Sequence, residues 1–228
     1  MRVLSLTHGA SVPGGVFEHE VEERGHVLER WSVPDGVAPD RPRAYDAVMV
    51  FGGAAHPDQD DHFAWLAHEE EFLREALAAE IPAFGVCLGA QMLARAGGGR
   101  VGPARAPEIG WYDVELTAEA RTDPVLRVMP PGAVVFQWHR YTYEIPPGGI
   151  ELARSPVATQ SFHLPPAAWA IQFHAEVTLP MLSSWIAEDP DDLLTSPAAL
   201  LEESERRIAA SNELGRALCA AFLARAER

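Results

Sequence analysis

IPAFGVCLGAQMLARAGGG, residues 81–99, is the stretch that decides the expected fold. Its first half is a short apolar run that ends at Val86 and is typical of a buried strand, and its second half predicts a helix that stops at the glycines 97–99. Cys87 therefore occupies a sharp turn between a strand and a helix, flanked by Gly85 and Gly89. Larger side chains at these two positions would clash with the neighbouring chain, so the pattern predicts a nucleophile elbow.

Short apolar runs alternate with helical patterns on both sides of this segment. Before it, the sequence predicts strands at 2–7, 26–31 and 44–53 and helices at 17–24 and 61–80. After it, Pro/Gly turns typical of hairpins separate strands expected at 110–116, 133–138, 150–153, 158–163 and 168–174.

These elements predict an α/β fold. We expect an open, twisted, mostly parallel sheet with helices on both faces, a flavodoxin-like three-layer arrangement in which the nucleophile elbow follows a central strand. The hairpins at the end make the sheet mixed. Because there is no internal repeat and no linker-like composition, we expect a single domain over residues 1–228, including a C-terminal helical segment at about 197–228.

The charge of the chain excludes several classes of protein. Its 33 acidic and 18 basic residues give a net charge of −15, and every basic residue is an arginine, because the sequence contains no lysine. A lysine-containing phosphate loop and a pyridoxal Schiff base are therefore excluded, and the missing basic stripe argues against a nucleic-acid partner. Without a long apolar run or a signal peptide, we expect a cytoplasmic protein with no membrane partner.

The two cysteines, Cys87 and Cys219, are too far apart in sequence for a disulfide framework or a structural zinc site to be expected. An isolated cysteine after an apolar strand is more often a small core residue, and Cys219, among apolar neighbours on the terminal helix, fits that interpretation. At Cys87 the flanking glycines favour a reactive thiol instead, because a helix N-terminus stabilises a thiolate and a developing oxyanion.

A thiol nucleophile needs a base and a group that orients the base. The apolar run AWAIQF is followed by His174 and Glu176, two positions apart, so their side chains leave the strand on the same side. For a lone histidine, a local hydrogen-bond partner would be the simpler interpretation. Ligand sites of doubly wound sheets lie beyond the carboxyl ends of the strands, where the turn after Val86 also opens, so we expect Cys87, His174 and Glu176 to converge.

GVCLGAQ and FHAE together resemble the class I glutamine amidotransferases, whose motifs are GxCxGxQ and, further along the chain, FHPE. The resemblance covers nearly the whole chain: FGGA, residues 51–54, stands at the family's oxyanion-loop glycines, and PEIGWYDVELT and VFQWHRYTYEIPPG are similar to family blocks. Within this family, the chain resembles stand-alone proteins that are similar to the glutaminase part of GMP synthetase. Two features differ, since Ala175 replaces the family's proline and GGAAHP lacks the family's GGPxS pattern.

This resemblance implies that Cys87 attacks the γ-carboxamide carbon of glutamine, which gives a γ-glutamyl thioester with loss of ammonia, and that water then hydrolyses the thioester. His174 would transfer the protons, and Glu176 would orient its ring. The backbone amides of Gly53 and Leu88 would stabilise the oxyanion. No cofactor is implied.

Substrate contacts are expected at Gln91, Gly52 and His139. Gln91 matches the last residue of the family's GxCxGxQ motif, although an ordinary glutamine on a helix surface is an open alternative. His139 belongs to the segment Trp138–Tyr141, which is expected after a strand and forms either a wall of the pocket or a packed aromatic end. Gly52 belongs to the expected oxyanion loop.

A possible metal site is set aside. The histidines at positions 56, 62 and 68 lie among Asp58, Asp60 and Asp61. A solvated acidic loop that runs into a helix explains this composition more simply, so no metal is expected.

Three functions are compatible with the sequence. A stand-alone γ-glutamyl peptidase or hydrolase, or a glutaminase that delivers ammonia to a separate synthetase subunit, would need the same Cys87 thioester. A non-catalytic binding module of the same fold is the third, and the complete set of Cys87, His174 and Glu176 argues against it. The resemblance to the amidotransferase family favours the glutaminase, with glutamine or another γ-glutamyl compound as the substrate.

Overall fold

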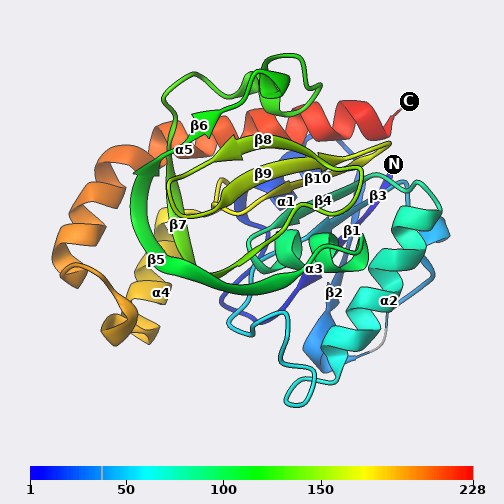
Figure 1. Cartoon of the computed structure of the whole chain (residues 1–228), viewed down its shortest axis with the longest axis horizontal. Coiled ribbons are helices and arrows are strands. Elements are labelled where there is room, and N and C mark those ends of the chain that lie inside the picture. The colour runs from blue at the N-terminus through cyan, green and yellow to red at the C-terminus, as the bar shows by residue number, and fades with distance from the viewer. Residues whose placement is uncertain (37, 228) are drawn as a thin grey trace.

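An eight-stranded sheet forms the centre of the computed structural model, which describes residues 1–36 and 38–227 (Figure 1). Its strand order is β2-β1-β3-β4-β10-β9-β8-β6. The strands are β1 (Arg2–Thr7), β2 (Val27–Ser32), β3 (Ala47–Val50), β4 (Ala83–Val86), β6 (Glu115–Leu116), β8 (Ile150–Arg154), β9 (Thr159–Leu164) and β10 (Ala168–Ile171). From β2 to β10 the neighbours are parallel, and from β10 to β6 they are antiparallel, so the predicted mixed, mostly parallel sheet is confirmed.

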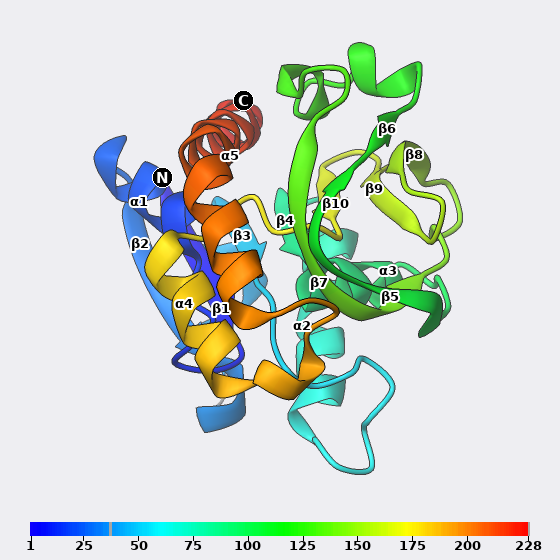
Figure 2. The same ribbon diagram turned by 90° about the vertical axis from the view of Figure 1, so that its left-hand side faces the viewer.

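Helices cover both faces of this sheet. One face carries α1 (Gly15–Glu23) and α5 (Pro197–Ala226), which pack against each other, and the other carries α2 (Trp65–Ala78) and α3 (Leu88–Ala96). Figure 2 shows α1 and α5 on the same side of the strands as α4 (Leu179–Glu188). Short 3₁₀ turns lie at Val33–Asp35, Pro42–Ala44, Glu119–Arg121, Leu126–Val128 and Pro190–Asp192.

The alternation of side chains along β1 explains the three layers. Val3 packs into the core beneath α1 and α5, whereas Leu4 and Leu6 pack into the core beneath α2 and α3. All three side chains are fully buried. At about 1.5–3 kcal/mol for each buried Val or Leu, both faces of the strand contribute to stability, and the sheet is fixed between its helices.

Two other strands form a separate antiparallel pair, which differs from the expectation. β5 (Val101–Asp113) pairs with β7 (Val134–Tyr143), and both lie outside the main sheet. The expected strand at 110–116 covers only the end of β5 and then β6. The first half of β5 contains Pro103 and Pro107, and its register shifts between Pro103 and Glu108. Because proline cannot donate to the ladder, this half lacks the sequence signature of a strand.

The last parallel strand is shorter than expected. β10 ends at Ile171, whose carbonyl oxygen accepts the backbone N–H of Cys87 at 2.9 Å. Beyond that bond β4 turns into α3 and can no longer pair with β10. His174 therefore lies past the end of the strand, where its N–H donates to the carbonyl oxygen of Phe136 in β7 at 2.8 Å.

Within the described part of the chain, no helix combines the length and the apolar character that crossing a membrane requires.

Candidate active site

The turn between β4 and α3 fixes the position of Cys87. Its φ of +54° and ψ of −109° are a strained conformation for a residue with a side chain. A Cβ atom at Gly85 would lie 2.5 Å from the carbonyl oxygen of Gly89, and one at Gly89 would lie 2.1 Å from that of Val50. Both distances are too short for real atoms, so the close approach of β3, β4 and α3 requires glycine at both positions.

His174 and Glu176 lie beside this turn. The Nδ1–H of His174 donates to Oε1 of Glu176 at 2.7 Å, and both side chains are almost fully buried. The side chain of Cys87 and the ring of His174 both lie next to Gly52 and line the same cavity. Because Glu176 engages Nδ1, Nε2 is the nitrogen that is free for the sulfur. The three residues expected to form a triad are therefore brought together.

The charges around His174 decide its protonation. Burial is the largest single influence and disfavours the imidazolium, but the carboxylate of Glu176 and the sulfur of Cys87 outweigh it and raise the pKa of His174 to about 10. At neutral pH the ring is therefore a cation beside the sulfur, a neighbour typical of reactive cysteines.

Neighbouring helices hold the turn that contains His174 and Glu176. The carbonyl oxygen of Glu176 accepts the backbone N–H of Val16 in α1 at 2.9 Å. A Cβ atom at Gly215 of α5 would lie 2.0 Å from the carbonyl oxygen of Ala175, so the helix backbone packs directly on this peptide. Asn212 of α5 donates to the carbonyl oxygen of Val177 at 2.7 Å. These contacts fix the turn at the position where Ala175 replaces the family's proline.

Two aromatic side chains close the other side of the triad. The ring centroid of His174 lies 5.1 Å from that of Trp185 in α4, in an edge-on arrangement, and Trp185 lies 6.0 Å from Trp138 of β7 in the same manner. The sulfur of Cys87 is 3.8 Å from the carbonyl oxygen of Trp138. These rings form an aromatic wall beside the triad.

Gly53 and Leu88, whose backbone amides are the expected oxyanion donors, lie close to Cys87. Both residues line a cavity together with Cys87, and Leu88 begins α3, where the helix leaves its first N–H groups unpaired. Gly52 lies between the triad residues, since a Cβ atom there would be 3.1 Å from Cε1 of His174 and 3.8 Å from Cβ of Cys87. This arrangement offers donors to a negative oxygen that forms next to the sulfur.

Gln91 and His139 have protein partners of their own. The amide nitrogen of Gln91 donates to the carbonyl oxygen of Tyr141 at 3.0 Å and to Oε1 of Gln172 at 3.1 Å. His139 has one ring nitrogen at 2.9 Å from the same carbonyl oxygen of Tyr141 and the other at 3.1 Å from Glu108. Both side chains are buried in the wall of the cavity, and the segment Trp138–Tyr141 lies within β7 rather than after a strand.

Two cavities meet at Cys87. One, of about 440 Å³, extends toward α4, and its walls include Val12, Trp138, Trp185, Glu188 and Asp189. The other, of about 280 Å³, extends toward α3 and β7, and its walls include His56, Leu88, Gln91, Arg140 and Tyr141. Gly53 and Ala54 belong to both. A substrate whose reactive carbon lies at the sulfur can therefore extend in two directions.

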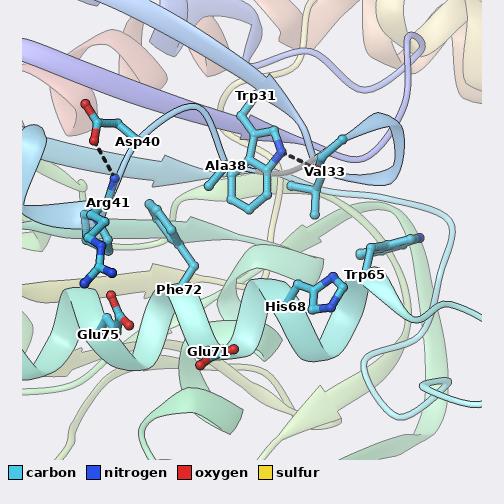
Figure 3. Close-up of a pocket in the computed structure, with 12 residues that line it drawn as sticks. Trp31, Val33, Ala38, Asp40, Arg41, Trp65, His68, Glu71, Phe72 and Glu75 are labelled. Carbon is cyan, nitrogen blue, oxygen red and sulfur yellow. Dashed lines mark hydrogen bonds between the residues drawn. The ribbon is translucent and has the colours of Figure 1, made fainter.

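A third cavity, of about 460 Å³, lies between α2 and the chain that follows β2 (Figure 3). Its aromatic walls are Trp31, Trp65 and Phe72, and its charged residues include Arg41 and Glu71. None of the triad residues lines it. The candidate site is therefore the pair of cavities at Cys87.

The histidines of the acidic segment do not gather around one point. Among the described residues, no group of three or more His, Cys, Asp or Glu side chains has the geometry to hold a metal ion. His56 stacks on the ring of Tyr141 with 3.9 Å between the centroids, which makes it a wall of the smaller cavity. Arg95 ties the same segment to α3 through Asp60, at 2.9 Å.

Sequence reasoning missed two contributors to this site. Trp185 lies on α4, which was not expected, although Thr178 followed by Leu179 and Pro180 is typical of a helix start. His8 follows β1 at the carboxyl edge of the sheet, the position at which sites are expected, and its ring nitrogen is 3.0 Å from the carbonyl oxygen of Gly52.

Comparisons with known proteins identify the family and the fold. The family described as "Glutamine amidotransferase class-I" matches residues 17–188. A solved structure of a glutamine amidotransferase from Thermotoga maritima is 31% identical and superimposes with a TM-score of 0.88 over 97% of each chain.

Two curated relatives have different names. A glutamine-hydrolyzing GMP synthase subunit of Ignicoccus hospitalis is 30% identical over 176 residues, which cover 72% of this chain and 85% of that protein. The gamma-glutamyl-L-1-hydroxyisopropylamide hydrolase of a Pseudomonas species is 29% identical over 151 residues, or 62% of this chain and 49% of the hydrolase. The chain thus spans about half the length of the second relative.

Proposed function

The chain belongs to the class I glutamine amidotransferase family, and from this premise we propose that it cleaves the side-chain amide of glutamine through a γ-glutamyl thioester on Cys87. The observation that supports this most strongly is the buried 2.7 Å contact between His174 and Glu176 beside a cysteine with φ of +54°. A core cysteine has no need of a strained backbone or of a charged histidine.

In the first half of the reaction, the Cys87 thiolate attacks the amide carbon. The carbonyl oxygen becomes negative and accepts hydrogen bonds from the backbone amides of Gly53 and Leu88, an interaction of about 3 kcal/mol for each donor in related cases. The tetrahedral intermediate then collapses, the C–N bond breaks, and the His174 imidazolium gives its proton to the departing nitrogen. Ammonia leaves, and the glutamyl group stays on the sulfur.

In the second half, His174 changes its role. Once the sulfur is acylated it no longer raises the pKa of the imidazole, and the ring has already given up its proton. The neutral ring removes a proton from water, whose oxygen attacks the thioester carbon. The C–S bond breaks and glutamate leaves, so the balance is glutamine and water in, glutamate and ammonia out. Glu176 holds the ring in one orientation throughout.

The smaller cavity is the proposed place for the glutamyl group. Its walls include Arg140, a cation that also pairs with Asp192 and suits a carboxylate, and the carbonyl oxygen of Tyr141 is held in place by both Gln91 and His139. We assign Gln91 and His139 to this wall as residues that shape the pocket, with Gly52 beneath the reacting group. The chemistry needs no cofactor, and a cytoplasmic location fits this reaction, with ammonia passed to a separate synthetase.

A second candidate is hydrolysis of a larger γ-glutamyl amide, which the cavity toward α4 favours. Its 440 Å³ far exceeds what ammonia needs, and its walls include Trp185 and Glu188, which do not line the proposed glutamyl pocket. Its apolar walls, Trp138 and Trp185, together with Glu188 and Asp189, suit an amine that has both an apolar part and a positive charge. The relative named as a hydrolase of a γ-glutamyl amide is consistent with this candidate.

The experiment that tests both candidates measures kcat/KM of the purified protein for glutamine and for γ-glutamyl amides of ammonia-sized, aliphatic and aromatic amines. The variant Trp185→Ala provides the matched comparison, since it shortens one wall of the larger cavity and leaves the triad intact. A preference for large amides that this variant reduces supports the second candidate. Slow cleavage of glutamine that a synthetase accelerates supports the first. Failure to cleave any γ-glutamyl amide, with no acylated Cys87 after acid quench, contradicts both.

A further inference from the structure

We propose that His8 and Glu69 form a positioning pair, which fixes the peptide between Gly52 and Gly53 so that the N–H of Gly53 faces the sulfur of Cys87. The inference rests on the proposed function, because it concerns the oxyanion donor of that reaction. Neither residue touches the substrate in this proposal. Their task is to hold one backbone amide in the orientation that catalysis needs.

Hydrogen bonds on both sides of the ring define the pair. His8 follows β1, and its Nδ1 lies 3.0 Å from the carbonyl oxygen of Gly52, while its Nε2 lies 2.9 Å from Oε2 of Glu69 in α2. Both partners are acceptors. A histidine that donates to two acceptors has a proton on each nitrogen, so the ring is an imidazolium that donates to Gly52 on one side and to a carboxylate on the other.

Burial makes this arrangement rigid. The side chains of His8 and Glu69 are exposed by only 1% and 0%, and the ring of Trp65 stacks on His8 with 5.2 Å between the centroids. Burial acts to lower the pKa of His8, but the charge of Glu69 and the hydrogen bond to it raise the pKa above its ordinary value. Separating the two charges would leave each of them buried without a partner, so the pair stays closed.

The planarity of the peptide bond transmits this contact to the active site. In a trans peptide the C=O and the following N–H point in opposite directions. His8 binds the Gly52 carbonyl oxygen, so the N–H of Gly53 points away from His8. Gly52 contacts Cε1 of His174, and Gly53 borders both cavities at Cys87. The free direction of the N–H is therefore toward the reacting group.

Only this peptide needs such a support. Phe51, the residue before it, is fixed by the sheet and by the elbow. Its N–H donates to the carbonyl oxygen of Leu6 at 3.0 Å, and its own carbonyl oxygen accepts the N–H of Gly89 at 3.2 Å. A peptide between two glycines can otherwise rotate at little cost. Gly53 also packs closely on the side chain of His8, since a Cβ atom at Gly53 would lie 2.6 Å from Cβ of His8.

This pair therefore keeps the oxyanion donor oriented within a single chain.

The test compares two variants that differ in one donor. Both variants carry Glu69→Gln, which removes the buried negative charge. One also carries His8→Asn, whose side-chain N–H lies near the position of Nδ1. The other carries His8→Leu, which has nearly the shape of asparagine but no donor. We expect kcat of H8L/E69Q to be about 10- to 100-fold below that of H8N/E69Q, with KM within threefold, because a misdirected oxyanion donor affects the transition state. Alkylation of Cys87 by iodoacetamide should proceed equally in both variants, since it needs no oxyanion hole.

Crystal structures of the two double variants give a readout that is independent of activity. The Gly52 carbonyl should keep its orientation in H8N/E69Q and turn away in H8L/E69Q. The control His163→Leu removes a half-buried histidine that lies 3.3 Å from Asp123 and lines neither cavity, and it should lower the melting temperature without changing kcat. If H8L/E69Q does not fold, H8Q/E69Q replaces it, since the glutamine amide reaches toward position 69 rather than Gly52.

Equal kcat in the two double variants, or an unchanged Gly52 peptide in the leucine variant, overturns the proposal. If wild-type protein cleaves no γ-glutamyl amide, the proposed function fails, and the structures of the variants still decide whether His8 holds the peptide.

Discussion

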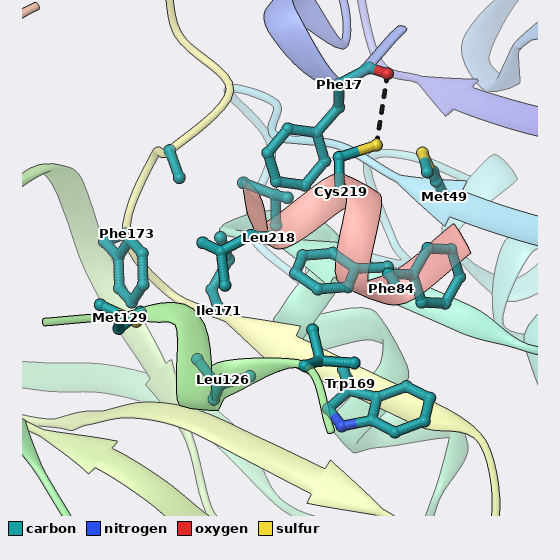
Figure 4. Packing of buried hydrophobic residues seen from close by; sticks show 14 of the residues in the cluster. Phe17, Met49, Phe84, Leu126, Met129, Trp169, Ile171, Phe173, Leu218 and Cys219 are labelled. Atoms are coloured by element: carbon teal, nitrogen blue, oxygen red, sulfur yellow. Dashed lines mark hydrogen bonds between the residues drawn. The ribbon is translucent and has the colours of Figure 1, made fainter. Parts of the chain in front are cut away.

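The two cysteines of this chain are both buried, yet their surroundings differ in every respect that matters for chemistry. Cys219 is fully buried within α5, and its thiol donates to the carbonyl oxygen of Phe17 at 3.5 Å (Figure 4). The side chains around it in Figure 4 are apolar, among them Phe84 and Leu218. Cys87 is 6% exposed, has positive φ, and borders two cavities and the ring of His174.

Burial by itself therefore does not decide what a thiol can do. At Cys219, burial and the charge of Glu20 raise the pKa, so the thiol stays neutral and packs as a small apolar group. Cys87 instead has a histidine cation and the start of a helix next to its sulfur, which are the surroundings in which reactive cysteines are found. The neighbouring charge makes the difference between a nucleophile and a core residue.

The largest expected effect is on turnover. Replacement of Cys87 by Ala should lower kcat for the best γ-glutamyl substrate by at least about 10⁴-fold, because no other group can form the thioester. Cys219→Ala should leave kcat within twofold. Steady-state kinetics of the two variants, prepared in parallel, measures both. Wild-type turnover in Cys87→Ala would rule out the thioester mechanism.

The second expected effect concerns the carboxylate that supports the nucleophile's base. Glu176→Gln should lower kcat/KM by about 10²- to 10⁴-fold, since the ring loses its counter-charge but keeps a hydrogen-bonding neighbour. The imidazolium is the proton donor, so wild-type activity should fall as pH rises through the His174 pKa of about 10. Without Glu176 that pKa drops, and the alkaline limb should move to lower pH. A pH–rate profile with an unmoved limb would contradict this role for Glu176.

Alkylation compares the two thiols directly. Iodoacetamide at neutral pH should modify Cys87 at least about 100-fold faster than Cys219, because the thiolate is the reactive species and Cys219 is both neutral and enclosed. Peptide mass mapping at short reaction times measures the ratio. His174→Ala should slow the reaction at Cys87 alone. Preferential modification of Cys219 would reverse our assignment of the two cysteines.

The smallest expected effect is on stability at high pH. The folded state keeps the Cys219 proton that the unfolded chain releases above about pH 8.5, so this residue contributes stability at neutral pH that is lost as pH rises. The slope is at most about 1.4 kcal/mol per pH unit. Urea unfolding at pH 7, 9 and 10 should show that the free energy of unfolding falls less steeply with pH for Cys219→Ala than for the wild type. At pH 7 the variant should be less stable than the wild type by about 1 kcal/mol. Equal slopes would show that the unfolded and folded thiols titrate alike.

The parallel half of the fold could be predicted from sequence because its signals are local. β1 and β4 are short apolar runs, and the glycines at 85 and 89 mark the elbow without reference to any distant residue. The second sheet could not be predicted in the same way. The pairing of β5 with β7 joins segments about 30 residues apart, and its irregular register around Pro103 depends on contacts that no local window contains.

The candidate site likewise contains residues that local sequence predicts and residues that it does not. Cys87, His174 and Glu176 belong to short motifs, so their proximity was expected from the carboxyl-edge rule alone. The neighbours of the triad come from elements whose positions only the tertiary structure reveals: Trp185 from α4 and Glu69 from the buried face of α2. Helical periodicity predicts that Glu69 lies near the core-facing side of its helix, but a buried carboxylate becomes explicable only once His8 is opposite it.

The contact of Gly215 with the carbonyl oxygen of Ala175 has a consequence for the order of events during translation. The segment that contains His174 and Glu176 leaves the ribosome before the helix on which it rests. At about 5–20 residues per second, Gly215 follows Glu176 by roughly 2–8 s. During that interval the backbone of α5 cannot yet support the peptide between the base and its orienting carboxylate. We therefore expect a nascent chain with a complete elbow to be inert toward amides until α5 has docked, and proteolytic removal of α5 from the finished protein to silence it.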